Sequence, residues 1–138
     1  MKKYKLAVVG ATGVVGRTVL KVLQEKNLPI SEYVFFASSK SAGKTIHFME
    51  KNYTIKELTE NSFDDKFDFA VFSAGGDTSK KYAPIAVSNG CIVVDNSSAF
   101  RMDPTVPLVV PEVNADDIKS IMALSLIQIV LQFKQYLY

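Results

Sequence analysis

The stretch KLAVVGATGVVGRTVLKVLQEK, residues 5–26, carries the clearest indication of the fold class. It opens with a short apolar run, residues 5–9, which is typical of a strand buried in a parallel sheet. Glycines stand at positions 10, 13 and 16, and apolar residues then recur at helical spacing up to about Lys26. Asn27 and Pro29 end that helix. The stretch therefore predicts a buried strand, a glycine-rich turn and an amphipathic helix, in that order.

The turn between this strand and helix is a candidate nucleotide site. Gly10, Gly13 and Gly16 permit a tight turn and let the backbone approach a pyrophosphate, while the helix N-terminus supplies N–H groups and the positive end of a dipole. The G-x-x-G-x-x-G spacing differs from the usual G-x-G-x-x-G, and no Lys-Ser/Thr follows, which excludes a P-loop. The alternative is a strand-to-helix turn that binds nothing.

Other apolar runs extend this pattern along the chain. Further core strands are predicted at residues 33–37, 67–73 and 91–95, and residues 44–58 alternate loosely enough for two short strands. The core strands are apolar on both faces, as expected when a sheet is covered on both sides.

The segments between and after these runs complete the expected architecture. Residues 78–88 predict a helix with a break or kink at Pro84, because proline inside a helix costs about 3 kcal/mol. Residues 96–111 are expected to form a long polar loop, 114–120 a short helix, and 121–138 a mostly helical segment after a short strand. Strands that alternate with helices predict an α/β fold: a Rossmann-like, mostly parallel sheet with helices on both faces, in a single domain.

The loop after the second core strand bears on the cofactor. NAD-binding folds usually place Asp or Glu there, on the ribose 2′-hydroxyl, whereas NADP needs hydrogen-bond donors and positive charge for its 2′-phosphate. Here the strand is followed by Ser38, Ser39, Lys40 and Ser41, with no acidic residue. We therefore predict NADP (NADPH) over NAD, against the alternative of an ordinary exposed polar loop.

Small and polar residues also follow the third and fourth core strands. Ligands in open α/β sheets bind at the carboxyl ends of the strands. Asn96 could bond the nicotinamide amide, and Arg101 could hold a phosphate or carboxylate through two parallel hydrogen bonds. The alternatives are turn chemistry alone and an ion pair of Arg101 with Asp103. The small residues after the third strand that would let the cofactor pass are Ser73, Ala74 and Gly75.

Composition excludes several classes of protein. The chain has 138 residues, 48% of them apolar, which suits one domain with a real core but not a cofactor domain plus a full substrate domain. The net charge is +2 with scattered basic residues, so no nucleic-acid footprint is visible. Single residues of cysteine (Cys91) and histidine (His47) exclude an internal disulfide, a zinc cluster and a His-rich metal site. With no signal peptide or membrane span recognised, we expect a cytoplasmic protein.

Four stretches together resemble aspartate-semialdehyde dehydrogenases of the bacterial NADP-dependent type. The resemblance covers roughly residues 5–121, and its longest part is the most specific. The stretches are GATGVVG at 10–16, ASSKSAGK at 37–44, FSAGG at 72–76 and VVDNSSAFRMDPTVPLVVPEVN at 93–114.

The resemblance implies a reaction and roles for residues. The family converts aspartyl phosphate and NADPH to aspartate semialdehyde, NADP and phosphate through a thioacyl intermediate on a cysteine. Arg101 would hold the substrate or inorganic phosphate. Lys40 stands where family members often have Arg, so it keeps the charge but loses the planar fork. The residues that would contact the NADP phosphates are Thr12, Gly13, Val14 and Val15, and those facing the 2′-phosphate are Ser38, Lys40 and Ser41.

The end of the chain departs from the family pattern. Where the family carries Asn-Pro-Asn-Cys-Ser-Thr, this sequence has Leu-Ser-Leu-Ile-Gln at 124–128, without a cysteine. Cys91 opens a core strand, where a buried and unactivated thiol is expected. We therefore expect a cofactor-binding domain at 1–123, an apolar and mostly helical segment at 124–138, and no activity from the chain alone. We also expect the family's substrate-binding and dimerisation domain to be absent from these 138 residues. The apolar residues 124–138 are predicted to mediate self-association.

Two other functions remain open at this point. The chain could be related to N-acetyl-glutamyl-phosphate reductases, although the stretches SAGG and DNSSAFRMDP favour aspartate-semialdehyde dehydrogenase. It could also be a non-catalytic NADP-binding module that senses the cofactor or binds a partner, which the missing cysteine favours.

Overall fold

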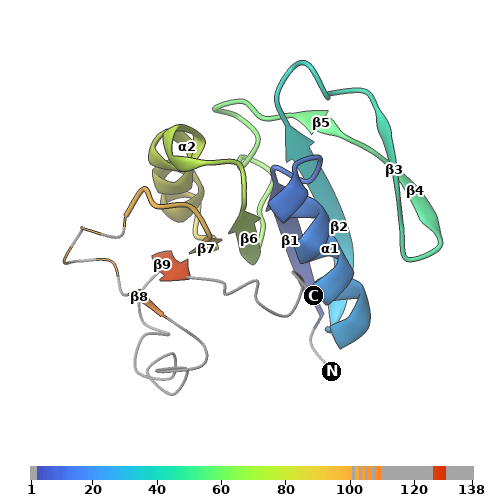
Figure 1. The fold of residues 1–138 in the computed structure, drawn as a ribbon, viewed down its shortest axis with the longest axis horizontal. Coiled ribbons are helices and arrows are strands. Elements are labelled where there is room, and N and C mark those ends of the chain that lie inside the picture. The colour runs from blue at the N-terminus through green and yellow to red at the C-terminus, as the bar shows by residue number, and fades with distance from the viewer. Residues whose placement is uncertain are drawn as a thin grey trace.

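A parallel sheet forms the centre of the protein in a computed structural model that describes residues 3–100, 102, 104, 106, 108–109 and 126–129 (Figure 1). The elements of the first half alternate as expected from the sequence, with strand, glycine turn and helix in the predicted order. The strands are β1 (Tyr4–Val9), β2 (Ile30–Ala37), β3 (Thr45–Phe48), β4 (Lys51–Thr54), β5 (Lys56–Glu57), β6 (Phe69–Phe72), β7 (Ile92–Asp95), β8 (Leu108–Val109) and β9 (Leu126–Ile129), and the helices are α1 (Val14–Lys26) and α2 (Gly76–Ser88).

The strand order explains where a ligand would bind. The main sheet runs β5-β2-β1-β6-β7-β9-β8, and every pair of neighbours in it is parallel. From β1 the chain builds the sheet first to one side, through β2, and then to the other, through β6 and β7. The order therefore reverses between β1 and β6, and in such sheets the crevice at the carboxyl ends of these two strands is the usual ligand site.

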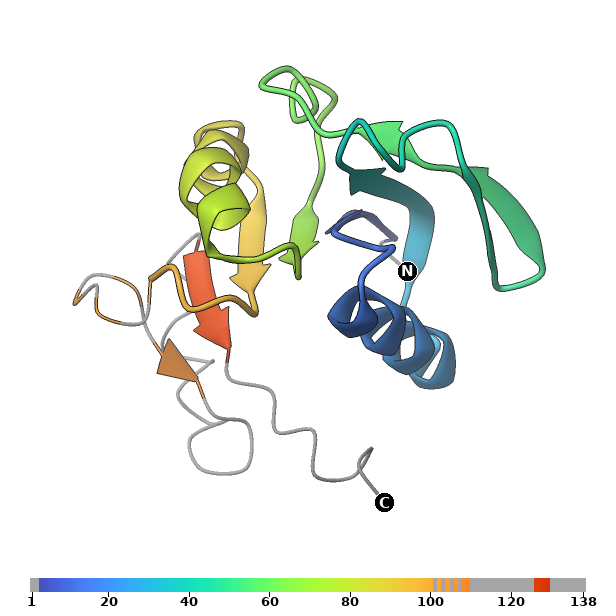
Figure 2. The ribbon, with the colours of Figure 1, turned by 45° about the horizontal axis from the view of Figure 1, so that its top comes forward.

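Alternate residues of β1 face two separate hydrophobic cores. Leu6 and Val8 pack with α1, β2 and the β3–β4 hairpin, whereas Ala7 and Val9 pack with α2. This division follows from the period of two along a strand. It places α1 and α2 on opposite faces of the sheet (Figure 2), which confirms the predicted Rossmann-like architecture.

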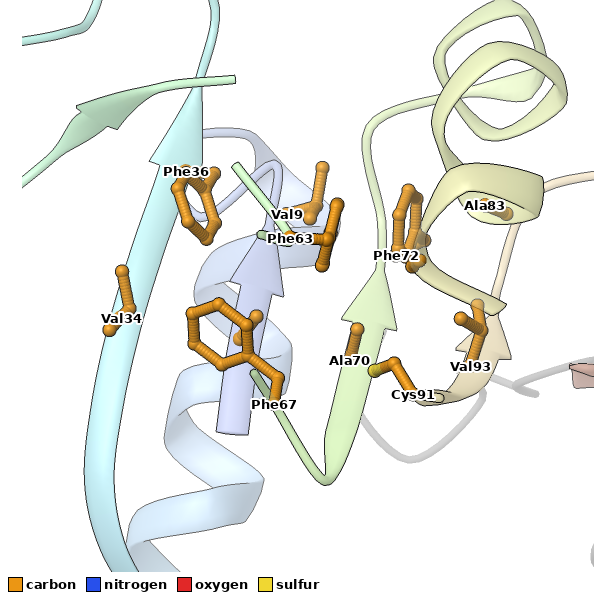
Figure 3. Packing of buried hydrophobic residues seen from close by; sticks show 12 residues of the cluster. Val9, Val34, Phe36, Phe63, Phe67, Ala70, Phe72, Ala83, Cys91 and Val93 are labelled. Atoms are coloured by element: carbon orange, nitrogen blue, oxygen red, sulfur yellow. The ribbon is translucent and has the colours of Figure 1, made fainter. Parts of the chain in front are cut away.

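The core under α2 is rich in aromatic residues. Phe63 lies between Phe36 and Phe72, with ring centroids 5.9 and 6.0 Å away (Figure 3). Phe67 completes the group at 5.9 Å from both Phe36 and Phe63. Aromatic pairs at such distances contribute roughly 0.5–1.5 kcal/mol each beyond the area they bury. The segment between β5 and β6, which carries Phe63 and Phe67, is thereby anchored beneath the sheet.

Helix α2 corrects one expectation. It runs from Gly76 to Ser88 with Pro84 inside it, so of the predicted break or kink at this proline, the break is wrong. The proline ring is exposed, so the Lys80 carbonyl that loses its helical donor can bond water instead. The other helix ends as predicted, with Asn27 in the left-handed conformation at φ 46°.

The strands outside the core also differ from the prediction. Residues 44–58 form three short strands rather than two, because β5 leaves the β3–β4 hairpin and pairs with the end of β2. The predicted loop 96–111 contains the two-residue strand β8.

The segment 124–138 was expected to be mostly helical, and the strand β9 within it shows that this was wrong for residues 126–129. Without β9, the hydrogen-bonding edge of β7 would be open, and β9 pairs with β7 on one side and β8 on the other. The rest of that segment and the predicted helix at 114–120 lie outside the described residues, as does the predicted self-association surface apart from β9. In the described part of the chain, no helix is long and apolar enough to cross a membrane.

Candidate functional site

Gly10 joins the first strand to its helix at the point where two turns of the fold approach each other. Its φ of +89° is a conformation that side chains disfavour, and its N–H donates to the Phe36 carbonyl over 2.9 Å. A Cβ at Gly10 would lie 2.8 Å from the backbone and side chain of Ala74, which follows β6. Glycine here lets the turns after β1 and β6 meet at the switch point of the sheet.

Gly13 and Gly16 have different roles in the same turn. Gly13 is the N-cap of α1, with φ −76°, and leaves the helix start without a side-chain cap. A Cβ on Gly16 would overlap the Gly10 carbonyl oxygen and lie 2.9 Å from Ala11. Gly16 is therefore a packing residue that lets the helix sit directly on the turn, whereas Gly13 faces outward.

A cavity of about 500 Å³ lies beside this turn; we call it the cofactor cavity. It collects residues from the carboxyl ends of three neighbouring strands and from the start of α2. Its lining residues are Val9, Gly10, Thr12, Gly13, Ala37, Ser38, Ser39, Glu57, Leu58, Ser73, Ala74, Thr78 and Tyr82.

The chemistry of the cofactor cavity suits an anionic, elongated ligand. Neither α1 nor α2 has a side-chain cap at its N-terminus, and the first turn of α1 carries no acidic residue. The N–H groups and dipole of α1 therefore remain available to phosphate oxygens, whereas Asp77 places a negative charge in the first turn of α2. Ser38 and Ser73 add hydroxyls to the lining, and the Ser73 hydroxyl donates to the Val9 carbonyl at 3.1 Å.

The residues predicted to bind a cofactor divide into three groups. Six line the cofactor cavity: Gly10, Thr12, Gly13, Ser38, Ser73 and Ala74. Six others are not among its lining residues: Val14, Val15, Gly16, Lys40, Gly75 and Asn96. Of these, the Val14 side chain is 84% exposed on the outer side of α1, and the Asn96 backbone N–H is bonded to the Phe72 carbonyl at 2.9 Å. Ser41 lines a second hollow, and Arg101 lies outside the described residues.

This second hollow, of about 390 Å³, lies on the outer side of the glycine turn; we call it the outer hollow. It shares Thr12 with the cofactor cavity and contains two cationic side chains, Arg17 and Lys44. Sequence reasoning missed both cations, because one belongs to α1 and the other precedes β3. Its lining residues are Ala11, Thr12, Arg17, Ser41, Lys44, Thr45, Ile46 and Ile55.

The sequence analysis also did not identify the residues from β5 and α2 that line the cofactor cavity. Glu57 and Leu58 reach it because β5 pairs with the end of β2, opposite Ala37, and the Leu58 N–H donates to the Ala37 carbonyl at 2.8 Å. Thr78 and Tyr82 stand one helical turn apart on α2, a spacing that could have suggested a shared face. An acidic residue thus lies at the end of β2 after all, although it comes from another strand.

A buried polar cluster joins the start of α2, which lines the cofactor cavity, to the end of β7. Asp95, at the end of β7, is fully buried and accepts hydrogen bonds from the hydroxyls of Ser79 and Ser97, both at 2.7 Å. The Ser97 N–H donates to the same carboxylate at 3.0 Å. Because Ser79 lies in the first turn of α2, this cluster ties the helix that lines the cofactor cavity to the end of β7.

The single cysteine lies in the core and not in either cavity. Cys91 is 1% exposed, beside Ala70 and Val93 under α2 (Figure 3). Burial raises the pKa of its thiol to about 12, and the charge of Asp68 acts in the same direction. The thiolate, which is the nucleophilic form, is therefore scarce at neutral pH. Within the described residues, no three His, Cys, Asp or Glu side chains gather closely enough to hold a metal ion.

We expect Cys91 to resist alkylation in the folded chain. Iodoacetamide at pH 8 should label it at a small fraction of the rate seen in denaturant, because the thiol is both covered and protonated. Mass spectrometry over time measures the rate, and a Ser98→Cys variant, with its thiol at an exposed position, is the control. Equal labelling of Cys91 and of Cys at position 98 in the folded protein would contradict the buried placement.

Comparison with known proteins gives consistent matches. A family model described as "Semialdehyde dehydrogenase, NAD binding domain" matches residues 5–121. The aspartate-semialdehyde dehydrogenase of Aquifex aeolicus is 59% identical over 117 residues, which are 84% of this chain and 34% of that protein. That of Campylobacter jejuni is 53% identical over 119 residues, 86% of this chain and 35% of that protein.

A solved structure agrees with these sequences. The crystal structure of aspartate semialdehyde dehydrogenase II of Vibrio cholerae, complexed with ASA, has a TM-score of 0.84 and 42% identity. The match covers 93% of this chain and 42% of that chain. The chain spans about a third of the length of the curated relatives it matches.

Proposed function

The chain belongs to the family of semialdehyde dehydrogenase NAD-binding domains, and from that premise we propose that it binds NADP(H) as the cofactor-binding part of an aspartate-semialdehyde dehydrogenase. The observation that carries the proposal is the position of the cofactor cavity. It lies at the carboxyl ends of β1 and β6, where the strand order reverses, and the glycine turn lines it.

The residues of the cofactor cavity fit a dinucleotide. Gly10 lets the turn pass close to Ala74, Gly16 lets α1 pack directly on the turn, and Thr12 and Gly13 line the cavity where the cofactor phosphates would lie. The uncapped start of α1 faces the same phosphates with its N–H groups. Ser73 and Ala74 leave room for the cofactor to pass toward Asn96 and the nicotinamide end. The cofactor, when bound, supplies or accepts the hydride of the reaction.

The proposed whole enzyme converts aspartyl phosphate to aspartate semialdehyde and phosphate with NADPH. In that reaction, a cysteine thiolate carries the acyl group, and Arg101 holds the substrate or inorganic phosphate. Cys91 does not supply that thiolate, because it is buried and its pKa is raised to about 12. We therefore propose that residues 1–123 form the cofactor domain and that the 138 residues are inactive by themselves.

A second candidate function follows from the same cysteine. A dinucleotide-binding module that senses the cofactor without catalysing a reaction needs the cofactor cavity but no nucleophile. The buried position of Cys91 is compatible with it. Both candidates require dinucleotide binding, so one experiment tests their shared premise.

Binding of NADPH to the purified chain tests the proposal. We expect the fluorescence of NADPH to change on titration with the chain, and NADH to bind more weakly by about tenfold or more, because it lacks the 2′-phosphate. A Gly10→Val variant, whose side chain would enter the space of Ala74, is the control for binding at the glycine turn. If the wild-type chain, shown to be folded by circular dichroism, binds neither nucleotide, the proposed function is wrong.

A further inference from the structure

We propose that Asp95 is a positioning residue for the cofactor: by accepting the hydrogen bond of Ser79, it fixes the start of α2 as the wall of the cofactor cavity on the nicotinamide side. The inference deepens the proposed function and rests on it, since it concerns how the same cofactor is held. It starts from a serine in the buried row of α2, where the other two residues are alanine.

The buried face of α2 is a narrow row of small residues. Ser79, Ala83 and Ala86 are all 0% exposed and follow one another at the spacing of a single helix face. Ala83 and Ala86 pack in the apolar core under the helix, together with Val93. Ser79 does not belong to that core, and its hydroxyl donates to the Oδ1 of Asp95 at 2.7 Å. The later turns of α2 are therefore held by apolar packing, whereas this hydrogen bond holds the first turn to the sheet.

Two glycines join β6 to α2 without packing against the rest of the chain. Gly75 is the N-cap of the helix, with φ +98°, and Gly76 is its first residue. A Cβ added at either position would meet no atom within 4 Å. Because glycine is the residue with the most conformational freedom, this link does not by itself set the direction of the helix. The direction of the first turn therefore depends on the hydrogen bond of Ser79.

The carboxylate of Asp95 is itself firmly placed. Asp95 is the last residue of β7 and stands in register with Phe72 of β6 and Gln128 of β9. Its side chain is fully buried, and Ser97 donates to it twice, through its hydroxyl at 2.7 Å and its N–H at 3.0 Å. An acceptor that is fixed both by the sheet and by the following turn can therefore set the position of the helix that bonds to it.

The bond between Ser79 and Asp95 bears on one half of the cofactor. In sheets of this kind the first strand-to-helix turn holds the pyrophosphate and the end of the second strand holds the adenosine ribose. Gly10 and Ser38 line the cofactor cavity on that side, whereas Thr78 and Tyr82 line it from α2. A dinucleotide whose adenosine lies at β2 therefore extends its nicotinamide half toward α2. Because Thr78 adjoins Ser79, a shift of the first turn of α2 should weaken binding of that half alone.

The experiment measures the affinities of NADPH and of adenosine 2′,5′-bisphosphate, which lacks the nicotinamide half, for the full chain and three variants. We expect Ser79→Ala to weaken NADPH binding by roughly 5-fold to 10-fold and to leave the bisphosphate unchanged, because the binding-competent position of α2 is then only partly populated. Asp95→Asn is the conservative variant and should keep most of the NADPH affinity, since its side-chain oxygen can still accept from Ser79. Ala86→Gly is the matched control, which loosens the same buried row but keeps the hydrogen bond of Ser79, and it should bind both ligands as the wild type does.

Each other outcome overturns the inference in a distinguishable way. If Ser79→Ala binds NADPH as tightly as the wild type, Asp95 does not position the helix for the cofactor, and the proposed function stands. If the bisphosphate is weakened equally, or if Ala86→Gly matches Ser79→Ala, the loss comes from a general loosening of the fold. If Asp95→Asn loses as much NADPH affinity as Ser79→Ala, the charge of Asp95 matters and its bond to Ser79 does not.

Failure of the proposed function has its own signature, because the folded wild type would then bind neither ligand, and this inference would fail with it. The affinities are compared at a temperature at which thermal melts show the wild type and every variant to be folded. A change in affinity then reports the position of α2 in the folded chain and not the fraction of chains that are unfolded.

Discussion

Gly16→Ala is expected to destabilise the chain by about 3 kcal/mol or more and to abolish dinucleotide binding. The added Cβ would overlap the Gly10 carbonyl oxygen and come within 2.9 Å of Ala11, and both neighbours are backbone. No rotamer relieves a clash between a Cβ and backbone atoms. The start of α1 would have to move away from the turn, which would displace Gly10, Thr12 and Gly13 in the lining of the cofactor cavity.

Gly13→Ala is the matched control for this prediction. A Cβ at Gly13 meets only the Gly10 oxygen, at an ordinary 3.8 Å, and its φ of −76° suits any residue. We expect a change in unfolding free energy within about 1 kcal/mol for this variant. Chemical denaturation followed by circular dichroism measures both variants. Equal stability of the two would contradict the close packing of α1 on the turn.

Asp95→Ala is expected to cost about 3–5 kcal/mol of unfolding free energy. The substitution leaves two serine hydroxyls and one backbone N–H without their shared acceptor, in a place closed to water. It also opens a small void between α2 and β7. Because Ser79 belongs to the first turn of α2, the loss should extend to the part of the cofactor cavity lined by Thr78 and Tyr82.

Two further variants distinguish the loss of the hydrogen bonds of Asp95 from the effect on stability of any substitution near β7. Ser98→Ala changes an exposed hydroxyl three residues away and should alter stability by less than about 0.5 kcal/mol. Ser79→Ala removes one donor and should cost about 1–3 kcal/mol. Denaturant titration of the three variants provides the ranking, and an Asp95→Ala chain as stable as Ser98→Ala would show that the cluster contributes nothing.

The local sequence was sufficient to predict the first strand, turn and helix of the fold. In residues 5–26, an apolar run, three glycines and a helical repeat each favour the same structure, so strand, turn and helix follow from short-range preferences. The same holds for the cores of β2, β6 and β7. Pro84 was misjudged because the sequence shows the cost of proline in a helix but not that this residue faces solvent.

Long-range pairing decided what the local patterns could not. Residues 126–129 are as apolar as a buried helix, and only the open edge of β7 makes them a strand. Glu57 reaches the end of β2 because β5 pairs there, which no rule about the residues after β2 can anticipate. The glycine turn at the start of a dinucleotide-type fold could be predicted from adjacent residues alone, because its signal lies within one short stretch. That Arg17 and Lys44 line one hollow beside that turn follows only from the packed fold, because α1 and the segment leading into β3 come together on the same face of the sheet.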